Sequence, residues 1–389
     1  MRLHMILPRV EPNAFKVPTA CPYPGCGGNH LELHQTVIKP VKDTEYQAVS
    51  AHRYRCLRCG RTFRVYPQGV TRDQTSQRVK GLGVFLYLLG LSYGAVSLAL
   101  DALGVYMART SVYAAVQAAA EKVPGMKRHE VFAGIRTPAL GGDVTSVKCR
   151  GQWLPLGLTV DDTTGLVLTV DLLTAEDAAT LKGWLEPIAA AVEAVLLVTD
   201  DADSFKSAAD ELGLEHQVCK SHVKRNTETL IENLEPLVEA DQDGSLAALG
   251  LTPEQARHDL QRLAELILSR QPGQEEELAE IYQRYTHAAS PAPGERASLA
   301  YRLRLLFLDR CNLWPRLTRY RTWRGPHGET VDGTNNNGSE RAIGWWVKER
   351  YRPMRGYKRP KSAVNVSRLV AWCGNYLDRG GADLAALIA

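Results

Sequence analysis

Residues 139–219 contain strand-like and helix-like segments in a distinctive order. This order restricts the possible folds of the chain more than any other feature of the sequence. Three consecutive segments alternate apolar and polar side chains, as strands with one buried face do: residues 140–149, 153–160 and 166–173. Helical and strand-like segments then alternate: residues 175–193 (helix), 194–199 (strand), 204–212 (helix) and 215–219 (strand). Strands joined by short turns pair antiparallel, whereas strands joined through helices pair parallel, so the order predicts a mixed sheet.

This is the element order of a ribonuclease-H-like α/β core, in which the first and fourth strands are neighbours. Asp143 lies within the first predicted strand, and Asp200 directly follows the fourth, so we expect their carboxylates side by side. A third carboxylate, Glu340, opens a later helix after the polar run at 334–339. Carboxylates that converge from separate elements can bind two Mg²⁺ or Mn²⁺ ions about 4 Å apart, an arrangement suited to phosphodiester chemistry.

Each of these carboxylates has a competing interpretation. Asp201 and Asp203 follow Asp200 so closely that either could be the second ligand, and Glu349 competes with Glu340 for the third position. Taken singly, an acidic residue is most often a surface group or a helix N-cap. Asp200 is favoured because it directly follows the strand, and Glu340 is favoured because of the polar run before it.

Four of the eight cysteines form two close pairs, Cys21 with Cys26 and Cys56 with Cys59. Two such pairs, separated by a β-rich stretch, can place four thiolates at the corners of a tetrahedron, which is the geometry of a structural Zn²⁺ site. A disulfide interpretation requires an oxidising compartment, and no signal-peptide pattern directs the chain to one. The pairs predict a small β zinc ribbon over residues 1–72.

Arginines and aromatic residues surround the second cysteine pair, a combination that suits contacts with phosphates and bases. The candidate DNA-binding residues here are Arg55, Arg58, Arg61 and Arg64. A ribbon that only packs against a neighbouring domain is the alternative.

Residues 73–125 predict a helical unit with a helix-turn-helix-like pair. Ser92 is a suitable N-cap for one helix, Gly104 suits a turn, and residues 108–120 predict a second helix. As a recognition helix, the second would expose a set of polar residues to DNA: Arg109, Thr110, Ser111, Tyr113 and Gln117. Alanine-rich helix pairs are also common as plain packing modules, so both interpretations stay open.

Three motifs together resemble the DDE transposases of bacterial insertion sequences, in particular the Mutator-like group. They are Val-Thr-Asp200, the downstream element Cys219-Lys-Ser-His222, and the run Thr-Asn-Asn-Asn-Gly-Ser before Glu340. The resemblance spans about 140–375, and it implies a helical insertion between the second aspartate and the glutamate. Here the 139 residues from 201 to 339 separate them. We therefore expect a core divided over residues 138–222 and 331–380, with the insertion at 223–330.

The resemblance also implies that Asp143, Asp200 and Glu340 bind catalytic Mg²⁺, and that the chain cuts transposon ends and joins them to target DNA. The basic and aromatic residues after Glu340 then suit a DNA track, with the candidates Lys348, Arg350, Arg352 and Arg355. Lys and Arg stems that merely cover the core are the alternative. The spacing of Cys219 and His222 allows metal binding, but packing beside the site is the favoured role.

The distribution of charge points to a polyanionic partner. The net charge of +4 is unevenly distributed along the chain: residues 53–80 and 301–360 are basic, and residues 231–300 are acidic. No stretch reaches the roughly 18 apolar residues of a membrane span, so we expect no membrane partner and a cytoplasmic, nucleoid-associated location. Recognition of two DNA ends implies a homodimer or a larger homo-oligomer. A DNA-binding regulator with an inactive core and a nuclease that cuts without joining are the rival hypotheses.

Overall fold

The chain folds around a central five-stranded sheet with the strand order β11–β10–β7–β8–β9. The strands are β7 (Ala139–Cys149), β8 (Gln152–Asp161), β9 (Leu166–Leu172), β10 (Leu196–Thr199) and β11 (Glu215–Val218). β7, β8 and β9 form an antiparallel meander, while β10 runs parallel to both β7 and β11. This order confirms the predicted mixed sheet and the pairing of its first and fourth strands, and it is consistent with a ribonuclease-H-like core.

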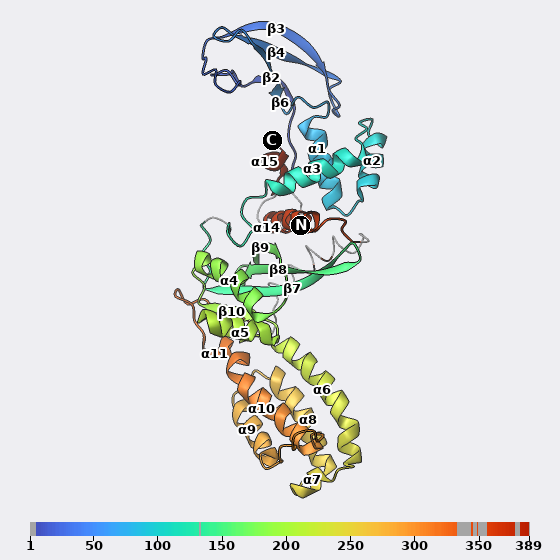
Figure 1. Cartoon of the computed structure of the whole chain (residues 1–389), viewed down its shortest axis with the longest axis vertical. Helices are drawn as coiled ribbons and strands as arrows, with labels where there is room; N and C mark the ends of the chain where they lie inside the picture. The colour runs from blue at the N-terminus through green and yellow to red at the C-terminus, as the bar shows by residue number, and fades with distance from the viewer. Residues whose placement is uncertain are drawn as a thin grey trace.

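The computed structural model describes residues 5–131, 134–332, 344, 348, 356–377 and 382–388. Figure 1 shows an elongated molecule with the sheet near its middle. A β ribbon and a helical unit lie towards one end of the long axis, and a helical insertion lies at the other.

Helices cover both faces of the sheet. On one face, α4 (Ala178–Val192) and α5 (Asp203–Leu212) bury Trp184 and Phe205 against the strands. On the other face, α14 (Pro360–Leu377) shares a hydrophobic core with β7, β8 and β9. The α4 face is packed so closely that a Cβ added at Gly157 of β8 would lie 2.7 Å from the Trp184 ring.

This packing gives a stability prediction. Gly157→Ala should lower the free energy of unfolding by about 1–3 kcal/mol, because the added methyl group forces the Trp184 ring out of its place. Gly183→Ala is the matched control, since Gly183 is an exposed position of α4 with open space around it, and alanine there should stabilise the helix by about 0.5–1 kcal/mol. Urea unfolding midpoints measure both. Equal stability of the two variants would show that the Trp184 ring does not restrict the size of the side chain at position 157.

The helical unit consists of α1 (Gln77–Leu88), α2 (Tyr93–Ala102) and α3 (Arg109–Glu121). Ser92 caps α2 as predicted, because its Oγ accepts a hydrogen bond from the Ala95 N–H at 3.1 Å. Gly104 provides the turn before α3 with a φ of +77°. The predicted pair of helices is therefore present.

The predicted orientation of α3 is wrong for two of its residues. Tyr113 and Gln117 were expected to face DNA, but they contact α14. The Tyr113 hydroxyl lies 3.0 Å from Ser362 Oγ, and Gln117 Oε1 accepts a hydrogen bond from Asn365 Nδ2 at 3.1 Å. The sequence pattern could not show this, because α14 covers the face from more than 240 residues away. Arg109 remains exposed at the first position of α3.

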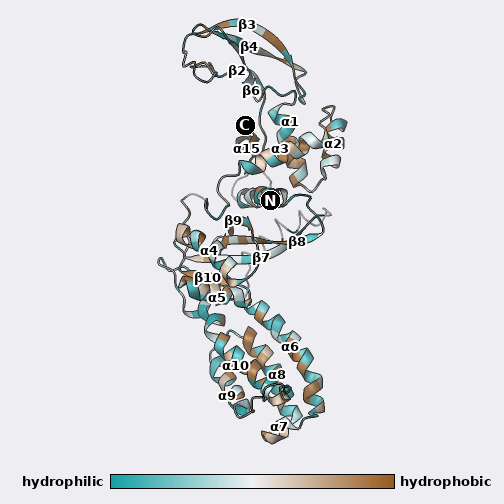
Figure 2. Ribbon diagram, viewed as in Figure 1, coloured by the Kyte–Doolittle hydropathy of each residue, from teal (hydrophilic) through white to brown (hydrophobic). Residues whose placement is uncertain are grey.

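The segment between β11 and the later part of the core is helical, as predicted. Its helices are α6 (Lys220–Ala240), α7 (Ser245–Ala248), α8 (Pro253–Leu268), α9 (Gln274–Tyr285), α10 (Leu299–Leu317) and α11 (Arg319–Thr322). They enclose a hydrophobic core of their own, in which Leu260, Phe307 and Trp314 are almost fully buried. Figure 2 shows brown apolar and teal polar residues alternating along these helices, as expected of amphipathic helices around a core. Within the described ranges, no helix is long and apolar enough to cross a membrane.

The β ribbon is built on the antiparallel strands β3 (Leu31–Pro40), β4 (Ala48–Cys56) and β5 (Thr62–Val65). β2 (Glu11–Phe15) pairs with β6 (Pro67–Gln68) beside them. The two cysteine pairs lie at the end of this sheet, because β4 ends at Cys56. At the junction with the helical unit, β1 (Met5–Ile6) pairs with β12 (Ala382–Asp383), and α15 (Leu384–Ile388) follows.

Candidate metal centres

The four cysteines of the ribbon converge. Their sulfur atoms all lie within 4.8 Å of one another, with Cys21 3.8 Å from Cys59 and Cys26 3.7 Å from Cys56. Zn–S bonds of about 2.3 Å in a tetrahedron place the sulfurs about 3.8 Å apart, so these distances suit Zn²⁺. Within the described part of the chain, this is the only cluster of three or more potential ligands.

Backbone geometry prepares the second cysteine pair for a metal. The backbone N–H of Cys59, and then that of Arg58, favour the thiolate and lower the pKa of Cys56 to about 7, against the opposing effect of burial. Gly60 follows with a φ of +69°, and its N–H donates to the Cys56 carbonyl at 2.8 Å. A Cβ at Gly28 would lie 2.8 Å from Cys56 Sγ, so the backbone closes tightly around the sulfurs.

Metal analysis checks this centre. The purified chain should contain one zinc ion, and Cys56→Ser should lose it and unfold the ribbon, because binding to a closed thiolate site contributes directly to folding. Cys311→Ser is the control, since Cys311 lies in α10 away from the cluster. Inductively coupled plasma mass spectrometry gives the zinc content, and hydrogen exchange over residues 21–65 gives the folding. Full zinc content in Cys56→Ser would contradict the assignment.

The strand register brings Asp143 and Asp200 to the same part of the sheet. β10 pairs with β7 through Leu197 opposite Leu140 and Val198 opposite Gly141. Continued for two residues beyond the last pair, this register would bring Asp200 opposite Asp143. Side chains alternate along a strand, and both aspartates therefore belong to the face that carries Ala139 and Val198. Both are partly exposed. The register therefore agrees with neighbouring positions for the two aspartates, and a metal shared by their carboxylates stays a prediction.

The segment before Glu340 crosses this same face. Trp323 and Val331 are buried against Ala139, Leu196 and Val198. Several predicted site residues after this segment lie outside the described residues: Glu340, its competitor Glu349, and Arg350, Arg352 and Arg355. Lys348 is described and is exposed.

The two competitors of Asp200 have other partners. Asp201 forms an ion pair with Lys206 at 2.9 Å and accepts a hydrogen bond from Asn226 Nδ2 at 3.1 Å, with its side chain only 6% exposed. Asp203 also pairs with Lys206, but its side chain is 96% exposed at the start of α5. Asp200 alone of the three continues β10 beside β7, and its Oδ1 accepts the Ala202 N–H at 3.1 Å.

Cys219 and His222 lie next to this site. Thr199 is opposite Val218 in the β10–β11 pair, and the Cys219 N–H donates to the Thr199 carbonyl at 2.9 Å. Cys219 is almost fully buried, and His222 is half-buried in the first turn of α6. In the described residues neither belongs to a cluster of three potential ligands, and the packing role of the two residues stays a prediction.

The predicted phosphate contacts of the ribbon are on its surface. Arg55, Arg58, Arg61 and Arg64 are all exposed. The Arg61 guanidinium lies over the Tyr23 ring, 5.1 Å from its centroid, which orients one of these cations.

A buried hydrogen-bond chain that the sequence did not indicate supports Asp200. Arg316 Nη1 lies 3.0 Å from His216 Nδ1, and His216 Nε2 lies 2.9 Å from Thr199 Oγ1. Arginine can only donate, so Nδ1 accepts and the proton of the neutral ring is on Nε2, which donates to Thr199. The Thr199 hydroxyl then donates to the Asp200 carbonyl at 2.9 Å. The chain therefore links α10 of the insertion to the backbone of the candidate ligand.

Burial and the neighbouring cations keep the His216 ring neutral. Burial, and then the Arg316 guanidinium, lower the pKa of His216 to about 3; Asp210 opposes them, and Lys206 adds a smaller lowering effect. Asp210 in turn accepts two hydrogen bonds of 2.7 Å from Arg316 Nη2 and fixes the guanidinium. No spacing pattern could have identified this set, because Arg316 and His216 are 100 residues apart.

The low pKa of His216 predicts a pH effect on stability. In the unfolded chain this histidine binds a proton near pH 6.5, whereas the folded chain does not until about pH 3, so stability falls as pH falls through this window. Between pH 7 and pH 5 the loss should be about 2 kcal/mol. His216→Gln, which can accept from Arg316 and donate to Thr199 without titrating, should lack this part of the loss. Urea unfolding at both pH values tests it, and equal pH dependence in the two proteins would contradict the neutral buried ring.

No protein-family profile and no curated protein sequence matches the chain. Similar solved structures include the HTLV-2 integrase catalytic core domain in complex with magnesium, with 22% identity over 28% of this chain and 77% of that chain, and a TM-score of 0.19. The Drosophila P element transposase strand transfer complex covers 80% of this chain and 94% of that chain at 11% identity, with a TM-score of 0.39. Because both TM-scores lie below 0.5, the fold assignment rests on the strand order.

Proposed function

We propose that the chain is a metal-dependent DNA strand-transfer enzyme of the transposase and integrase type. The observation that supports this most strongly is the parallel β7–β10 register, whose continuation past Val198 would bring Asp143 and Asp200 to one face of the mixed sheet. The segment that leads to Glu340 packs on that same face through Trp323 and Val331.

The proposed metal ligands are Asp143, Asp200 and Glu340. They offer only oxygen atoms, which suits Mg²⁺ or Mn²⁺, and two such ions supply charge stabilisation and activation of the attacking oxygen in phosphodiester chemistry. The chain itself holds Asp200 in place through Thr199 and His216, and keeps Asp201 engaged with Lys206. A hydroxyl at a DNA 3′ end is the proposed nucleophile in joining, so no serine or tyrosine is assigned that role.

The ribbon and the helical unit would hold the DNA. Zinc in the Cys21, Cys26, Cys56 and Cys59 cluster would have a structural role only, because four thiolates leave no position for water. The exposed arginines of the ribbon and Arg109 would contact phosphates, and Lys348, Arg350, Arg352 and Arg355 would extend the contact beside Glu340. The sequence motifs support a substrate of insertion-sequence ends and target DNA, with the enzyme acting as a homodimer or larger assembly in the nucleoid.

Site variants test the proposal. Asp143→Asn and Asp200→Asn should each reduce Mg²⁺-dependent or Mn²⁺-dependent cleavage of DNA by on the order of a hundredfold or more, because each removes a charged metal ligand. Asp203→Asn is the matched control, since its side chain is almost fully exposed and it pairs only with Lys206 and not with β7. Denaturing gels of labelled DNA separate cut strands from joined strands.

The products also distinguish the rival functions. Joined strands that require both aspartates support a transposase. Cut strands without joining would indicate a nuclease, and DNA binding that neither aspartate variant alters, with no cutting under any metal, would indicate a regulator with an inactive core.

A further inference from the structure

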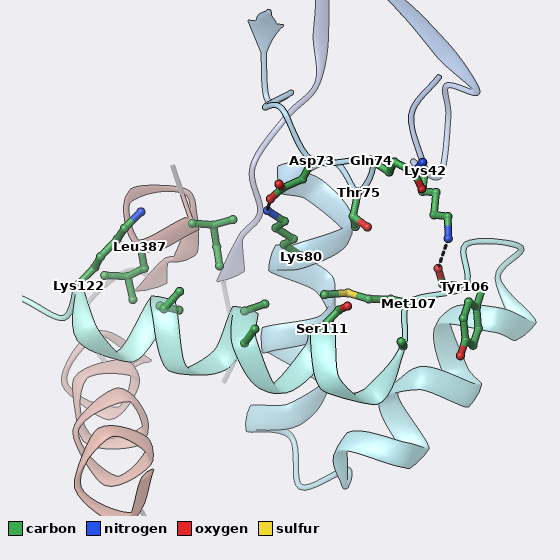
Figure 3. Close-up of a pocket in the computed structure, with 16 residues that line it drawn as sticks. Lys42, Asp73, Gln74, Thr75, Lys80, Tyr106, Met107, Ser111, Lys122 and Leu387 are labelled. Carbon is green, nitrogen blue, oxygen red and sulfur yellow. Dashed lines mark hydrogen bonds and ion pairs between the residues drawn. The ribbon is translucent and has the colours of Figure 1, made fainter. Parts of the chain in front are cut away.

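A groove of about 680 Å³ runs along α3 where the ribbon, the helical unit and the C-terminal helix α15 meet. Figure 3 shows α3 along the groove, with residues 73–75 of the linker before α1 on one side and Leu387 of α15 near the end that carries Lys122. Of the residues that line it, Ser111 is one of the predicted recognition residues of α3. The groove lies far from the candidate Mg²⁺ ligands in the central sheet (Figure 1).

Small residues form the α3 side of the groove. They recur three or four positions apart on one face of the helix: Ala108, Ser111, Ala114, Ala115, Ala118 and Ala119. Ala114 and Ala118 are exposed, and Glu121 is drawn towards α14 by Lys361 at 2.6 Å. The face therefore has neither bulk nor negative charge to hold a ligand away from the helix.

Three lysines line the groove over its length. Figure 3 shows Lys122 at the far end of α3, Lys80 near its middle and Lys42 beyond its start. The span from residue 108 to residue 122 is about 21 Å of helix. Asp73, the acidic residue among the lining residues, pairs with Lys80, so the lining has an excess of positive charge.

The positive surface continues from the groove onto the ribbon. Lys42 Nζ donates to the Tyr106 carbonyl at 3.5 Å and lies 5.6 Å from the centre of that ring. Lys39, at the end of β3, donates to the Arg72 carbonyl at 3.0 Å, and burial and then Arg64 lower its pKa against the effect of Asp73. Lys39 therefore contacts the residue next to Asp73 of the groove, and it carries positive charge from the groove onto β3 of the ribbon.

We infer that one sugar-phosphate backbone of a DNA duplex lies along this track, from Lys122 past Lys80 and Lys42 to the ribbon. This rests on the proposed function and specifies how the DNA is held. Lysines on flexible stems match phosphates as point charges, and a track longer than the groove fits a continuous polyanion better than a short acidic peptide.

The inference changes the role of α3. A recognition helix reads base edges with side chains that reach into the major groove and form hydrogen bonds. Ala114 and Ala118 have no such groups, and Tyr113 and Gln117 are turned towards α14. Beyond its exposed first turn, which carries Arg109, Thr110 and Ser111, α3 therefore receives the backbone of the DNA, and binding along Ala114 and Ala118 does not depend on the base sequence.

Salt-dependent DNA binding tests the track. The variant Lys42→Ala/Lys122→Ala should decrease the slope of log K against log salt by about two, because each lysine that contacts a phosphate contributes about 0.9. The loss of affinity should be the same for duplexes of unrelated sequence. Lys182→Ala/Lys224→Ala is the matched control, since these lysines lie on α4 and α6 in exposed pairs with Glu211 and Glu228. Fluorescence anisotropy with labelled duplexes and no divalent metal gives both quantities.

A second pair of variants fills the groove without removing a cation. Ala118→Glu should weaken binding at least tenfold, and Ala118→Ser should not, with thermal unfolding confirming that both fold. An unchanged slope in the lysine variant, or a loss confined to one base sequence, would overturn the inference. A lysine variant that no longer binds poly-glutamate but still binds DNA as tightly as the unmodified protein would also overturn it, because the groove would then be a site for an acidic peptide. The binding assay contains no divalent metal, so its results do not depend on DNA cleavage. If the lysine variant shows the reduced slope but the protein cuts no DNA, the binding track is supported and only the proposed enzyme activity is contradicted.

Discussion

The parallel pairing of β10 with β7 is the contact on which the rest of the architecture depends. It joins the antiparallel meander to the helix-and-strand half of the core across residues that are nearly 60 positions apart. Because a shift by one residue would turn each side chain to the opposite face, the register also decides whether Asp143 and Asp200 share a face. The apolar residues around them resist such a shift, since Ala139, Leu196 and Val198 are buried under Trp323 and Val331.

Polar contacts beneath the site add a constraint that packing alone would not give. A buried histidine and a buried threonine carry a desolvation cost unless each polar atom has a hydrogen-bond partner. Here Arg316 donates to His216, and His216 donates to Thr199. The chain ends on the carbonyl of Asp200 and begins on a helix of the insertion. A displacement of α10 would therefore leave buried groups without partners, so the insertion is coupled to the site through a defined set of atoms.

The features that were predictable from the sequence are those with local causes. Alternation fixes strands, Ser92 caps the helix that follows it, and two cysteine pairs with glycines beside them bring four sulfurs together. The features that were missed depend on partners distant in the sequence. Tyr113 and Gln117 lie on a helical face that α14 happens to cover, and the contact between Arg316 and His216 has no counterpart in any short motif. Asp200 could be preferred to Asp201 from the strand end, but the engagement of Asp201 by Asn226 required the fold.

α14 connects the helical unit to the sheet. On one side Ser362 and Asn365 contact α3, and on the other side Asn375 accepts the Val167 N–H at 2.9 Å and donates to the Val167 carbonyl at 2.8 Å, as a neighbouring strand would. Arg368 adds a hydrogen bond to the Val170 carbonyl and an ion pair with Asp171, both below 3 Å. Polar contacts on both sides are directional, so α14 sets both the distance and the rotation between α3 and β9. A DNA backbone held along α3 would then stand in a fixed relation to the carboxylates of the sheet, which is what cleavage at a defined position requires.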